Sequence, residues 1–216
     1  MAQTFTDLIP TARAFFGELS QNNTREWFKE NKSRYDNGLK ASALELLDSI
    51  APKLSDLLEQ PVNTKLFRAH RDVRFSKDKT PYSLHLHMLW APQGNGTQPV
   101  YFFGIAEDYV TAGAGIMGFD KTQQADWRAW VSEREGAAFQ NKIDALTSQG
   151  ASLREPELKR VPSPFDKDHP QADLLRRKSF TIWNEIGADA KKDLPKTLFE
   201  AFKSFDGPME DLRSFL

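Results

Sequence analysis

SLHLHMLW, residues 83–90, places an apolar side chain at every second position. Successive side chains of a β-strand point to opposite faces, so this alternation predicts a strand with one face in the core. One face would carry Leu84, Leu86, Met88 and Trp90, and the other would carry Ser83, His85, His87 and Leu89. The stretch therefore predicts a half-buried strand that holds both histidines on the same side.

The sequence around this strand predicts further strands downstream and a helix upstream. Residues 100–106 and 109–112 have strand composition and are separated by two acidic residues, which predicts a hairpin. Over residues 24–60, apolar side chains recur every three or four positions, the pattern of an amphipathic helix. Thr24 is a natural N-cap for this helix, and Pro52 is expected to kink or divide it.

The C-terminal half of the chain predicts mostly helices. Gly150 is placed to end one of them, and Pro195 is expected to bend or interrupt another. A run with four prolines between these two positions predicts an ordered loop. The predicted elements are helices at residues 122–132, 135–149 and 189–205 and a strand at residues 178–186. Together the elements define the α+β class, with an antiparallel or mixed central sheet flanked by helices.

No repeat, low-complexity tract or linker divides the 216 residues, so we expect a single domain over residues 1–216. This domain would contain a long N-terminal helical segment at about 24–60, a sheet at about 65–112, and a C-terminal part of helices and loops. Sixteen phenylalanines and five tryptophans supply bulky rings for its core.

The composition excludes several functional classes. The chain has no cysteine, which excludes disulfides, thiolate nucleophiles and cysteine-bound zinc. No segment approaches the ~20 apolar residues of a membrane-spanning helix, and the N-terminal residues lack a secretory signal pattern. We therefore expect a cytoplasmic protein with no membrane partner. A net charge of −1 argues against a protein that coats duplex DNA with a broad basic face.

Positive charge is concentrated in KLFRAHRDVRFSKDKTPYSLHLH, residues 65–87, where six Lys or Arg accompany two Asp, a local charge of +4. Such a concentration suits an anionic ligand, because it raises the local concentration of anions. If the chain is extended over residues 67–75, one polar face would carry Arg68, His70, Asp72 and Arg74. The alternative is an Arg–Asp network that solvates a sheet edge, with SKDK as a charged turn.

Several side chains of this segment are candidates for a small-molecule site. Arg68, Arg71 and Arg74 are expected to clamp a phosphate or carboxylate, because a guanidinium can bind either group through two parallel hydrogen bonds. Asp72 would orient one of these guanidiniums. The residues expected to position the bound molecule are Ser76, Lys77, Lys79 and Tyr82.

His85 is a candidate acid or base, because an unperturbed imidazole has a pKa of about 6.5. His85 and His87 lie two positions apart on one strand face, a spacing that lets both reach one metal ion together with His169 or Asp72. Histidines at this spacing more often form hydrogen bonds or pack, so we expect no metal and assign no cofactor.

The stretch GAGIMG, residues 113–118, has GxGxxG spacing between a predicted strand and a predicted helix. Its backbone amides could cradle an anion at the helix N-terminus. The preceding strand belongs to a hairpin rather than to a parallel βαβ unit, so the dinucleotide-binding fingerprint lacks its context. We expect a glycine turn that serves tight packing.

Two C-terminal motifs, DKDHP (residues 166–170) and LLRRKSF (residues 174–180), add titratable groups. His169 is a second candidate acid or base, and Lys178 is a further candidate ligand-binding residue, if both meet the basic segment across the sheet. The candidate catalytic residues are thus His85, His169 and Asp72. The alternative is simple turn chemistry around DHP and a solvated basic face at RRK.

Together these motifs resemble a known family. The runs REWFKENKSRY (residues 25–35), FRAHRDVRFSKDKTPY (residues 67–82), DKDHP and LLRRKSF are similar to the bacterial and fungal family called Domain of Unknown Function 2461. The resemblance implies no activity, because none is established for that family. Its pattern falls on the candidate residues from Arg68 to Tyr82 and on His85, His169 and Lys178. The sequence differs directly after this run, where Ser83 and Leu84 replace an expected Lys and Thr.

We expect the chain to bind a phosphorylated or carboxylated small molecule, which is compatible with a hydrolase or transferase reaction without requiring one. A second hypothesis is a noncatalytic module that binds single-stranded nucleic acid by stacking bases on Phe75, Tyr82 or Trp90. A third hypothesis is an interaction protein whose basic edge contacts an acidic partner.

Overall fold

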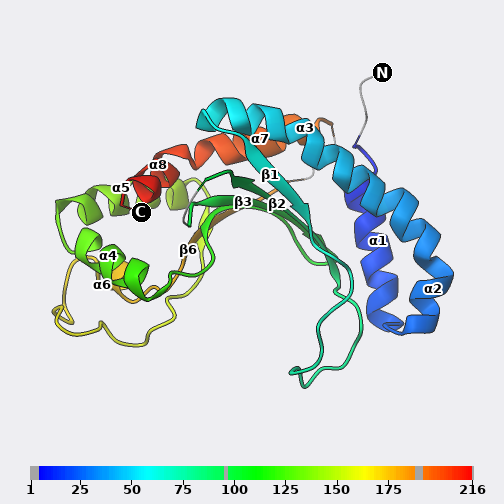
Figure 1. Cartoon of the computed structure of the whole chain (residues 1–216), viewed down its shortest axis with the longest axis horizontal. Helices are drawn as coiled ribbons and strands as arrows, with labels where there is room; N and C mark the ends of the chain where they lie inside the picture. Colours follow the sequence, from blue (N-terminus) through cyan, green and yellow to red (C-terminus); the bar gives the residue numbers. More distant parts are fainter. Residues whose placement is uncertain (1–4, 95–96, 188–191, 216) are drawn as a thin grey trace. The chain divides into compact units, whose positions relative to one another are not determined.

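The computed structural model describes residues 5–94, 97–187 and 192–215 (Figure 1). Its elements include a π-helical segment, labelled η1, between two α-helices. The elements are, in chain order, α1 (Leu8–Gln21), α2 (Arg25–Ser33), η1 (Arg34–Lys40), α3 (Ala41–Leu58), β1 (Val62–Leu66), β2 (His85–Pro92), β3 (Val100–Ala106), β4 (Val110–Ile116), α4 (Lys121–Val131), α5 (Arg134–Ser148), β5 (Ser152–Leu153), α6 (Ala172–Leu175), β6 (Phe180–Glu185), α7 (Leu194–Ser204) and α8 (Asp206–Phe215).

The strands form one six-stranded antiparallel sheet with the order β1-β2-β3-β4-β6-β5. β1 and β2 pair in a register that runs from Val62↔Pro92 to Leu66↔Met88. The predicted β3–β4 hairpin is confirmed, and the Ala106 N–H donates to the carbonyl oxygen of Tyr109 at its turn. Helices and this sheet confirm the α+β class.

The chain divides into two compact units. Unit 1 consists of the described parts of Met1–Gln93, Phe102–Ala112 and Glu185–Glu200, and unit 2 of those of Gly94–Tyr101, Gly113–Asn184 and Ala201–Leu216. β3, β4, β6 and α7 each contribute residues to both units. The single domain expected from the sequence therefore stays a prediction.

The N-terminal helical segment of unit 1 runs from α1 to α3. Thr24 caps α2 as predicted, because its Oγ1 accepts a hydrogen bond from the Trp27 N–H at 3.2 Å. The long helix predicted after this cap is present, but its middle part, η1, is π-helical, which the apolar periodicity does not indicate. Pro52 lies inside α3, so this proline does not divide the helix, and the alternative, a kink, stays a prediction.

The apolar face of β2 packs against α3, which lies over β1 and β2 in Figure 1. Trp90 is fully buried, and its indole N–H donates to the Leu47 carbonyl oxygen at 3.0 Å. Half-buried and buried side chains alternate along His85–Pro92, with both histidines on the half-buried side as predicted. The strand begins two residues later than expected, so Leu84 is exposed rather than part of the core.

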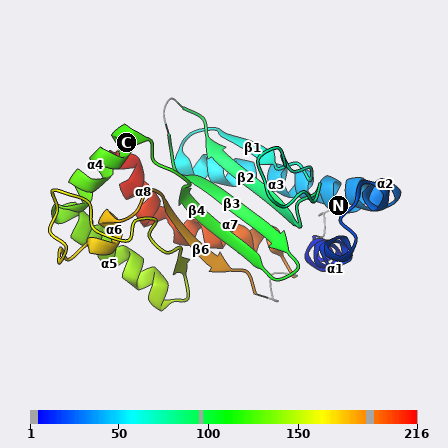
Figure 2. The same cartoon turned by 90° about the horizontal axis from the view of Figure 1, so that it is seen from below.

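Unit 2 is built around Trp127 of α4. Its ring centroid lies 5.2 Å from that of Phe119, 5.7 Å from that of Phe139 and 5.9 Å from that of Phe180. The Trp127 indole N–H donates to the carbonyl oxygen of Leu174 at 2.9 Å, so the buried ring keeps its hydrogen bond. α4 packs against α5, α6 and α8 (Figure 2). The two helices predicted for the middle of the chain are confirmed as α4 and α5.

The glycine-rich stretch GAGIMG continues β4 instead of forming a turn. Gly113 and Gly115 belong to the strand, so the anion cradle considered for this stretch is wrong. A Cβ at Gly113 would meet the Trp183 ring, and one at Gly115 would meet the Phe180 carbonyl oxygen. Gly115 also has a φ of +138°, a backbone angle that residues with a side chain rarely adopt. Close packing is therefore the role of these glycines, as the alternative predicted, although within a strand.

The last part of the chain differs from its prediction in two helices. The predicted proline-rich loop and the strand after it are present, the strand as β6. Residues 189–191 of the helix predicted at 189–205 lie outside the described residues, and α7 covers most of the rest. Pro195 lies in the first turn of α7, where its missing N–H removes no helical hydrogen bond, so the predicted bend is wrong. α8 was not predicted. It contains Pro208, which would disrupt a helix interior but is tolerated here in the first turn.

Candidate functional site

Most of the basic segment lies in the long connection between β1 and β2, which extends away from the strands in Figure 1. In this basic loop, residues 67–84, the strand expected for the first half is absent, and His70 and Tyr82 form an isolated antiparallel bridge instead. Next to the bridge, the Arg71 N–H donates to the Pro81 carbonyl oxygen at 2.9 Å. The four polar residues expected to share one strand face therefore lie in an irregular loop.

Arg71 closes the basic loop from within. Its Nη1 lies 2.5 Å from Asp78 Oδ2 and 3.1 Å from the Thr80 carbonyl oxygen. The Thr80 N–H donates to Asp78 Oδ1 at 2.9 Å. These bonds lower the pKa of Asp78 to about 2, first through the Thr80 N–H and then through the Arg71 guanidinium. The guanidinium of Arg71 is therefore already engaged in holding the loop together.

Arg74 is held by its neighbour Asp72. Its Nη2 lies 2.6 Å from Asp72 Oδ2, and its Nε donates to Oδ1 at 3.0 Å. Hydrogen bonding by the Arg74 side chain is the main reason that the pKa of Asp72 is lowered. Lys79 Nζ donates to the Val73 carbonyl oxygen at 2.9 Å. These bonds correspond to the exposed Arg–Asp network that was the alternative to an anion clamp, and such pairs contribute little stability.

The tip of the basic loop presents an aromatic ring to solvent. Phe75 is 96% exposed, and the Arg74 Cζ lies 5.8 Å from its ring centroid. Ser76 donates its backbone N–H to the Val73 carbonyl oxygen at 3.3 Å, and Lys77 is exposed beside it. The tip therefore combines an apolar ring with two cations.

A cavity of about 420 Å³ in unit 1 is lined by α2, η1, α3 and the residues that lead into the basic loop. Three cations and one carboxylate line it, and together these four side chains carry a net charge of +2: Lys32, Lys40, Arg68 and Asp36. Its apolar lining consists of Phe28, Tyr35, Leu44, Leu66, Phe67 and Ala69. We refer to this cavity as the cationic pocket.

The π-helical segment η1 supplies one wall of the cationic pocket, with Tyr35, Asp36 and Lys40. π-Helical turns are rare and occur frequently at functional sites. Lys32 of α2 donates a hydrogen bond to the Asp36 carboxylate, and this bond is the main reason that the pKa of Asp36 is lowered. The charge of Lys40 also helps to lower this pKa, and neither Lys40 nor Arg68 forms an ion pair within the described residues.

Tyr82 anchors the basic loop next to the cationic pocket. The Asn23 side chain donates through Nδ2 to the Tyr82 carbonyl oxygen at 2.9 Å, and its Oδ1 accepts from the Tyr82 N–H at 3.1 Å. The Tyr82 ring stacks on Phe28, with centroids 3.9 Å apart. Tyr82, a candidate ligand-positioning residue, is buried and does not line the pocket, and its contacts favour a structural role behind Phe28.

His85 and His87 stack on the half-buried side of β2, with ring centroids 3.7 Å apart. His87 Nε2 lies 2.6 Å from the Tyr109 hydroxyl oxygen. Gly104 has no side chain, which leaves room for the His87 and Tyr109 rings. Burial, and then the positive charge of Arg71, lowers the pKa of His85 and favours its neutral form. Among the residues that the structure describes, no three His, Asp or Glu side chains gather into a possible metal site.

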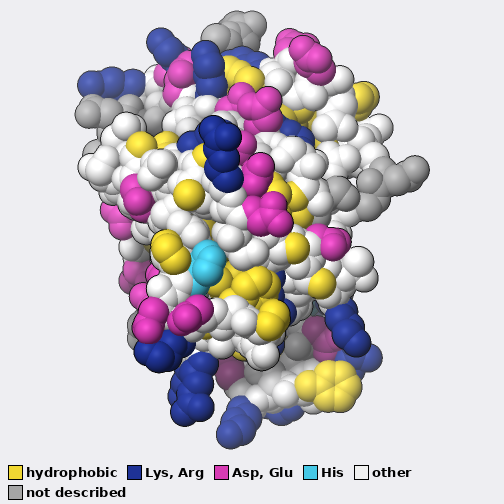
Figure 3. All heavy atoms as spheres, turned by 90° about the vertical axis from the view of Figure 1, so that its left-hand side faces the viewer, with side chains coloured by type: hydrophobic (Ala, Val, Ile, Leu, Met, Phe, Trp, Pro, Cys, Tyr) yellow, Lys and Arg dark blue, Asp and Glu magenta, His cyan; other side chains and the backbone are white. Residues whose placement is uncertain are grey.

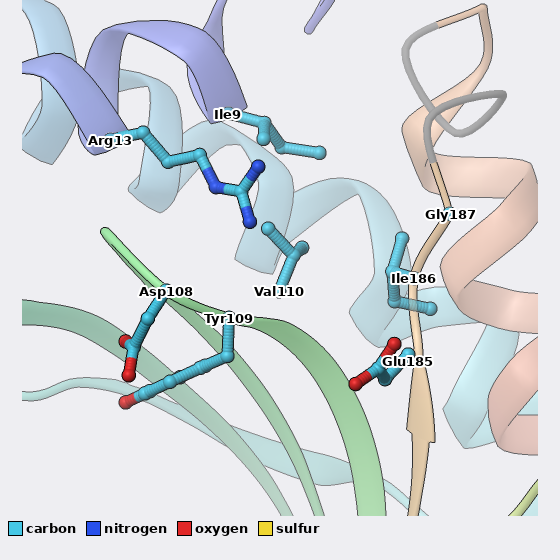
Figure 4. Close-up of a pocket in the computed structure, with 8 residues that line it drawn as sticks. All are labelled: Ile9, Arg13, Asp108, Tyr109, Val110, Glu185, Ile186 and Gly187. Atoms are coloured by element: carbon cyan, nitrogen blue, oxygen red, sulfur yellow. The ribbon is translucent and has the colours of Figure 1, made fainter.

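A smaller cavity of about 160 Å³ in unit 1 lies beside α1 and β4 (Figure 4). Arg13 reaches from α1 toward Val110, whereas Asp108 points away from the guanidinium. Asp108 and Glu185 bring two carboxylates to a lining with one cation. This balance disfavours an anionic ligand, so the cationic pocket is the better candidate.

His169 and Lys178 lie in unit 2, whereas the basic loop and the cationic pocket belong to unit 1. His169 Nδ1 accepts a hydrogen bond from the Gln171 N–H at 3.1 Å, and the His169 N–H donates to the Asp166 carbonyl oxygen at 3.1 Å. The backbone N–H of Lys178 donates to Glu157 Oε2 at 2.8 Å. These bonds agree with simple turn chemistry around DHP, whereas the solvated face expected at RRK is wrong for Arg177, which is buried. A shared site with the basic loop stays a prediction.

The sequence pattern identified Arg68 of the cationic pocket but missed Lys32 and Lys40. The available signal was the four-residue spacing of Lys32, Asp36 and Lys40, which places the three on one face of a helix. Charged residues at this spacing are common on exposed helix faces. The signal becomes informative only when Arg68 is known to lie opposite.

These observations define an α+β protein with an antiparallel sheet and a cationic pocket under its N-terminal helices. The chain belongs to the family described as "Conserved hypothetical protein (DUF2461)", whose model matches residues 11–210. This match confirms the resemblance and includes every residue of the cationic pocket and the basic loop. No curated protein matches the chain. Within the described residues, no helix combines the length and apolarity needed to cross a membrane.

Proposed function

We propose that this chain is a cytoplasmic protein that binds a small phosphorylated or carboxylated molecule in the cationic pocket. One observation supports the proposal: Lys32, Lys40 and Arg68 line a cavity whose lining has a single carboxylate. The cavity volume of about 420 Å³ is typical of small-molecule sites, which span roughly 300–1,000 Å³. Arg68 can bind an oxyanion through two parallel hydrogen bonds, and Lys40 adds a mobile point charge.

His70 is the residue on which a hydrolase or transferase reaction would depend. Either reaction needs a group that moves a proton at the bound molecule. His70 lines the cationic pocket, whereas His85, the acid or base expected from the sequence, is not among the lining residues. The pocket lining therefore supports the binding proposal, and His70 replaces His85 as the candidate acid or base for any reaction there.

Isothermal titration calorimetry with phosphate, sugar phosphates, nucleotides and small carboxylates tests the proposal. Arg68→Ala should weaken binding of the selected anion by about tenfold or more, because a charged hydrogen bond contributes roughly 1.5–3 kcal/mol. The matched control is Lys29→Ala, which removes an exposed cation of α2 outside the pocket lining and should leave the affinity unchanged. No binding of any anion, or equal binding by Arg68→Ala, would contradict the proposal.

Phe75 favours a second candidate function, the binding of single-stranded nucleic acid. Its ring is 96% exposed beside cations, an arrangement on which a base can stack. Tyr82 and Trp90, the other stacking residues expected from the sequence, are buried, so that part of the hypothesis is wrong. On the face drawn in Figure 3, basic and acidic side chains are interspersed, which agrees with a local contact rather than a broad nucleic-acid surface.

Fluorescence anisotropy with a labelled oligothymidylate tests this second function. Binding should weaken steeply as salt increases, because phosphate contacts release counterions. Phe75→Ala should then lower the affinity, whereas Leu84→Ala, which shortens another exposed apolar side chain of the basic loop, should not. The absence of binding at low salt would reject this function and leave the small-molecule proposal unaffected.

A further inference from the structure

The cationic pocket also contains apolar side chains that are unusually open to solvent. Leu44 is 44% exposed and Phe67 is 38% exposed, and both line this cavity. Exposed apolar groups that gather inside a charged rim are typical of ligand-binding surfaces, since a bound molecule removes them from water. A bare phosphate or acetate would neutralise the cations but would leave these two side chains in contact with water.

The rest of the lining is rich in rings. Phe28 and Tyr35 are buried in the floor, with ring centroids 5.3 Å apart. The His70 ring lies 6.0 Å from Phe28 at an interplanar angle of 61°. With Phe67, four rings line the cavity. Aromatic rings attract one another in edge-to-face and offset arrangements, so this lining favours a planar ring over a flexible chain.

Lys40 and Arg68 are placed to hold the charged end of such a molecule. Among the described residues, no carboxylate forms an ion pair with Lys40 or Arg68. Lys32 is already bonded to Asp36. The pocket thus combines two cations that have no ion pair, Lys40 and Arg68, with an apolar, aromatic lining. A molecule that carries both a negative charge and an apolar ring would match both features.

We propose that the ligand of the cationic pocket is an aromatic anion, a single aromatic ring that carries a phosphate or carboxylate group. This inference rests on the proposed function and specifies its ligand class. Arg68 and Lys40 bind the anionic group, and the ring covers Leu44 and Phe67. The free energy from burying the ring adds to that from the charged group, so ring-bearing anions bind more tightly than small polar ones.

Calorimetry with matched pairs of probes measures the contribution of the ring. Phenyl phosphate should bind at least about tenfold more tightly than methyl phosphate. Benzoate should exceed acetate in affinity by a similar factor. In Leu44→Gln, the ratio for each pair should fall below its wild-type value, because a polar side chain replaces an apolar one that the ring would cover. Met117→Gln, which changes an equally open apolar side chain outside the pocket, should keep the wild-type ratios.

The outcomes separate this inference from the proposed function. Equal affinities for phenyl phosphate and methyl phosphate would overturn the inference and leave the anion site in place. Tighter binding of hexyl phosphate than of phenyl phosphate would also overturn it, because a flexible chain would then be the preferred apolar group. If none of these anions binds, both the inference and the proposed function fail.

Discussion

The Tyr82 ring lies flat on the Phe28 ring, with centroids 3.9 Å apart and an angle of 10° between the planes. The Asn23 side chain forms two hydrogen bonds to the Tyr82 backbone at the same place. The end of the basic loop is thus joined to α2 by packing and by hydrogen bonds. Because Phe28 lines the cationic pocket, these contacts of Tyr82 help to position the wall of the proposed site.

Removal of the Tyr82 ring should destabilise the protein. Tyr82→Ala is expected to lower the free energy of unfolding by about 3–5 kcal/mol, because it deletes a buried ring and leaves a cavity. Urea denaturation followed by tryptophan fluorescence measures this change. Tyr82→Phe keeps the stacked ring and should cost less than about 1.5 kcal/mol. Similar midpoints for Tyr82→Ala and wild type would show that the stack contributes little.

The hydrogen bonds from Asn23 should protect the Tyr82 amide. Asn23→Ala leaves the Tyr82 N–H and carbonyl without these partners and should cost about 1–3 kcal/mol. Amide hydrogen exchange measures the loss directly, as faster exchange at Tyr82. The control is Asn37→Ala, whose side chain donates to the exposed Ser33 hydroxyl and should not change this rate. Unchanged exchange in Asn23→Ala would disprove the anchoring role.

The basic loop should open in acid. The pKa of Asp78 is lowered from 3.8 to about 2, so its ionised form stabilises the closed loop above the unfolded-state pKa. This contribution should be lost as the pH falls from about 4 through about 2. NMR measures it through the Thr80 amide, which donates to Asp78. Asp78→Asn should remove this pH dependence, and a Thr80 amide that does not titrate in wild type would contradict the expectation.

A side chain at Gly104 should disrupt the histidine pair. A Cβ there would lie 2.9 Å from His87 Cδ2 and 3.2 Å from Tyr109 Cε2, so Gly104→Ala should cost about 1–3 kcal/mol through overpacking. Chemical denaturation measures the cost, and NMR reports the His87 environment. The control is Gly38→Ala in η1, where a Cβ meets nothing within 4 Å and should add about 0.5–1 kcal/mol. Equal stability of the two variants would refute this packing argument.

The parts of the fold that depend on local pattern were predictable from the sequence. The alternation that places His85 and His87 on one side of β2 is a property of neighbouring residues, as is the cap at Thr24. Within the basic loop, the nearby acids Asp72 and Asp78 made the internal pairing of the arginines a visible alternative. The sequence could not decide between that pairing and a ligand, because both use the same charges.

The cationic pocket was not predictable, because it depends on residues that are distant in sequence. Lys40 and Arg68 line one cavity only when the basic loop is fixed to α2 by Asn23 and Tyr82. The π-helical segment that carries Lys40 continues the apolar periodicity of the helices around it, so no local signal marks it. The sequence thus predicted the kind of chemistry but only one of the three cations.

The π-helical segment η1 also makes the number of residues between α2 and α3 important. A π turn accommodates one residue more than an α turn, and each residue of a helix turns the chain by about 100°. Deletion of a single residue from η1 would therefore convert this turn toward an α turn and change the spacing of Tyr35, Asp36 and Lys40 along the cavity wall. Insertions and deletions in this segment should be tolerated far less than substitutions at its exposed positions, such as Asn37.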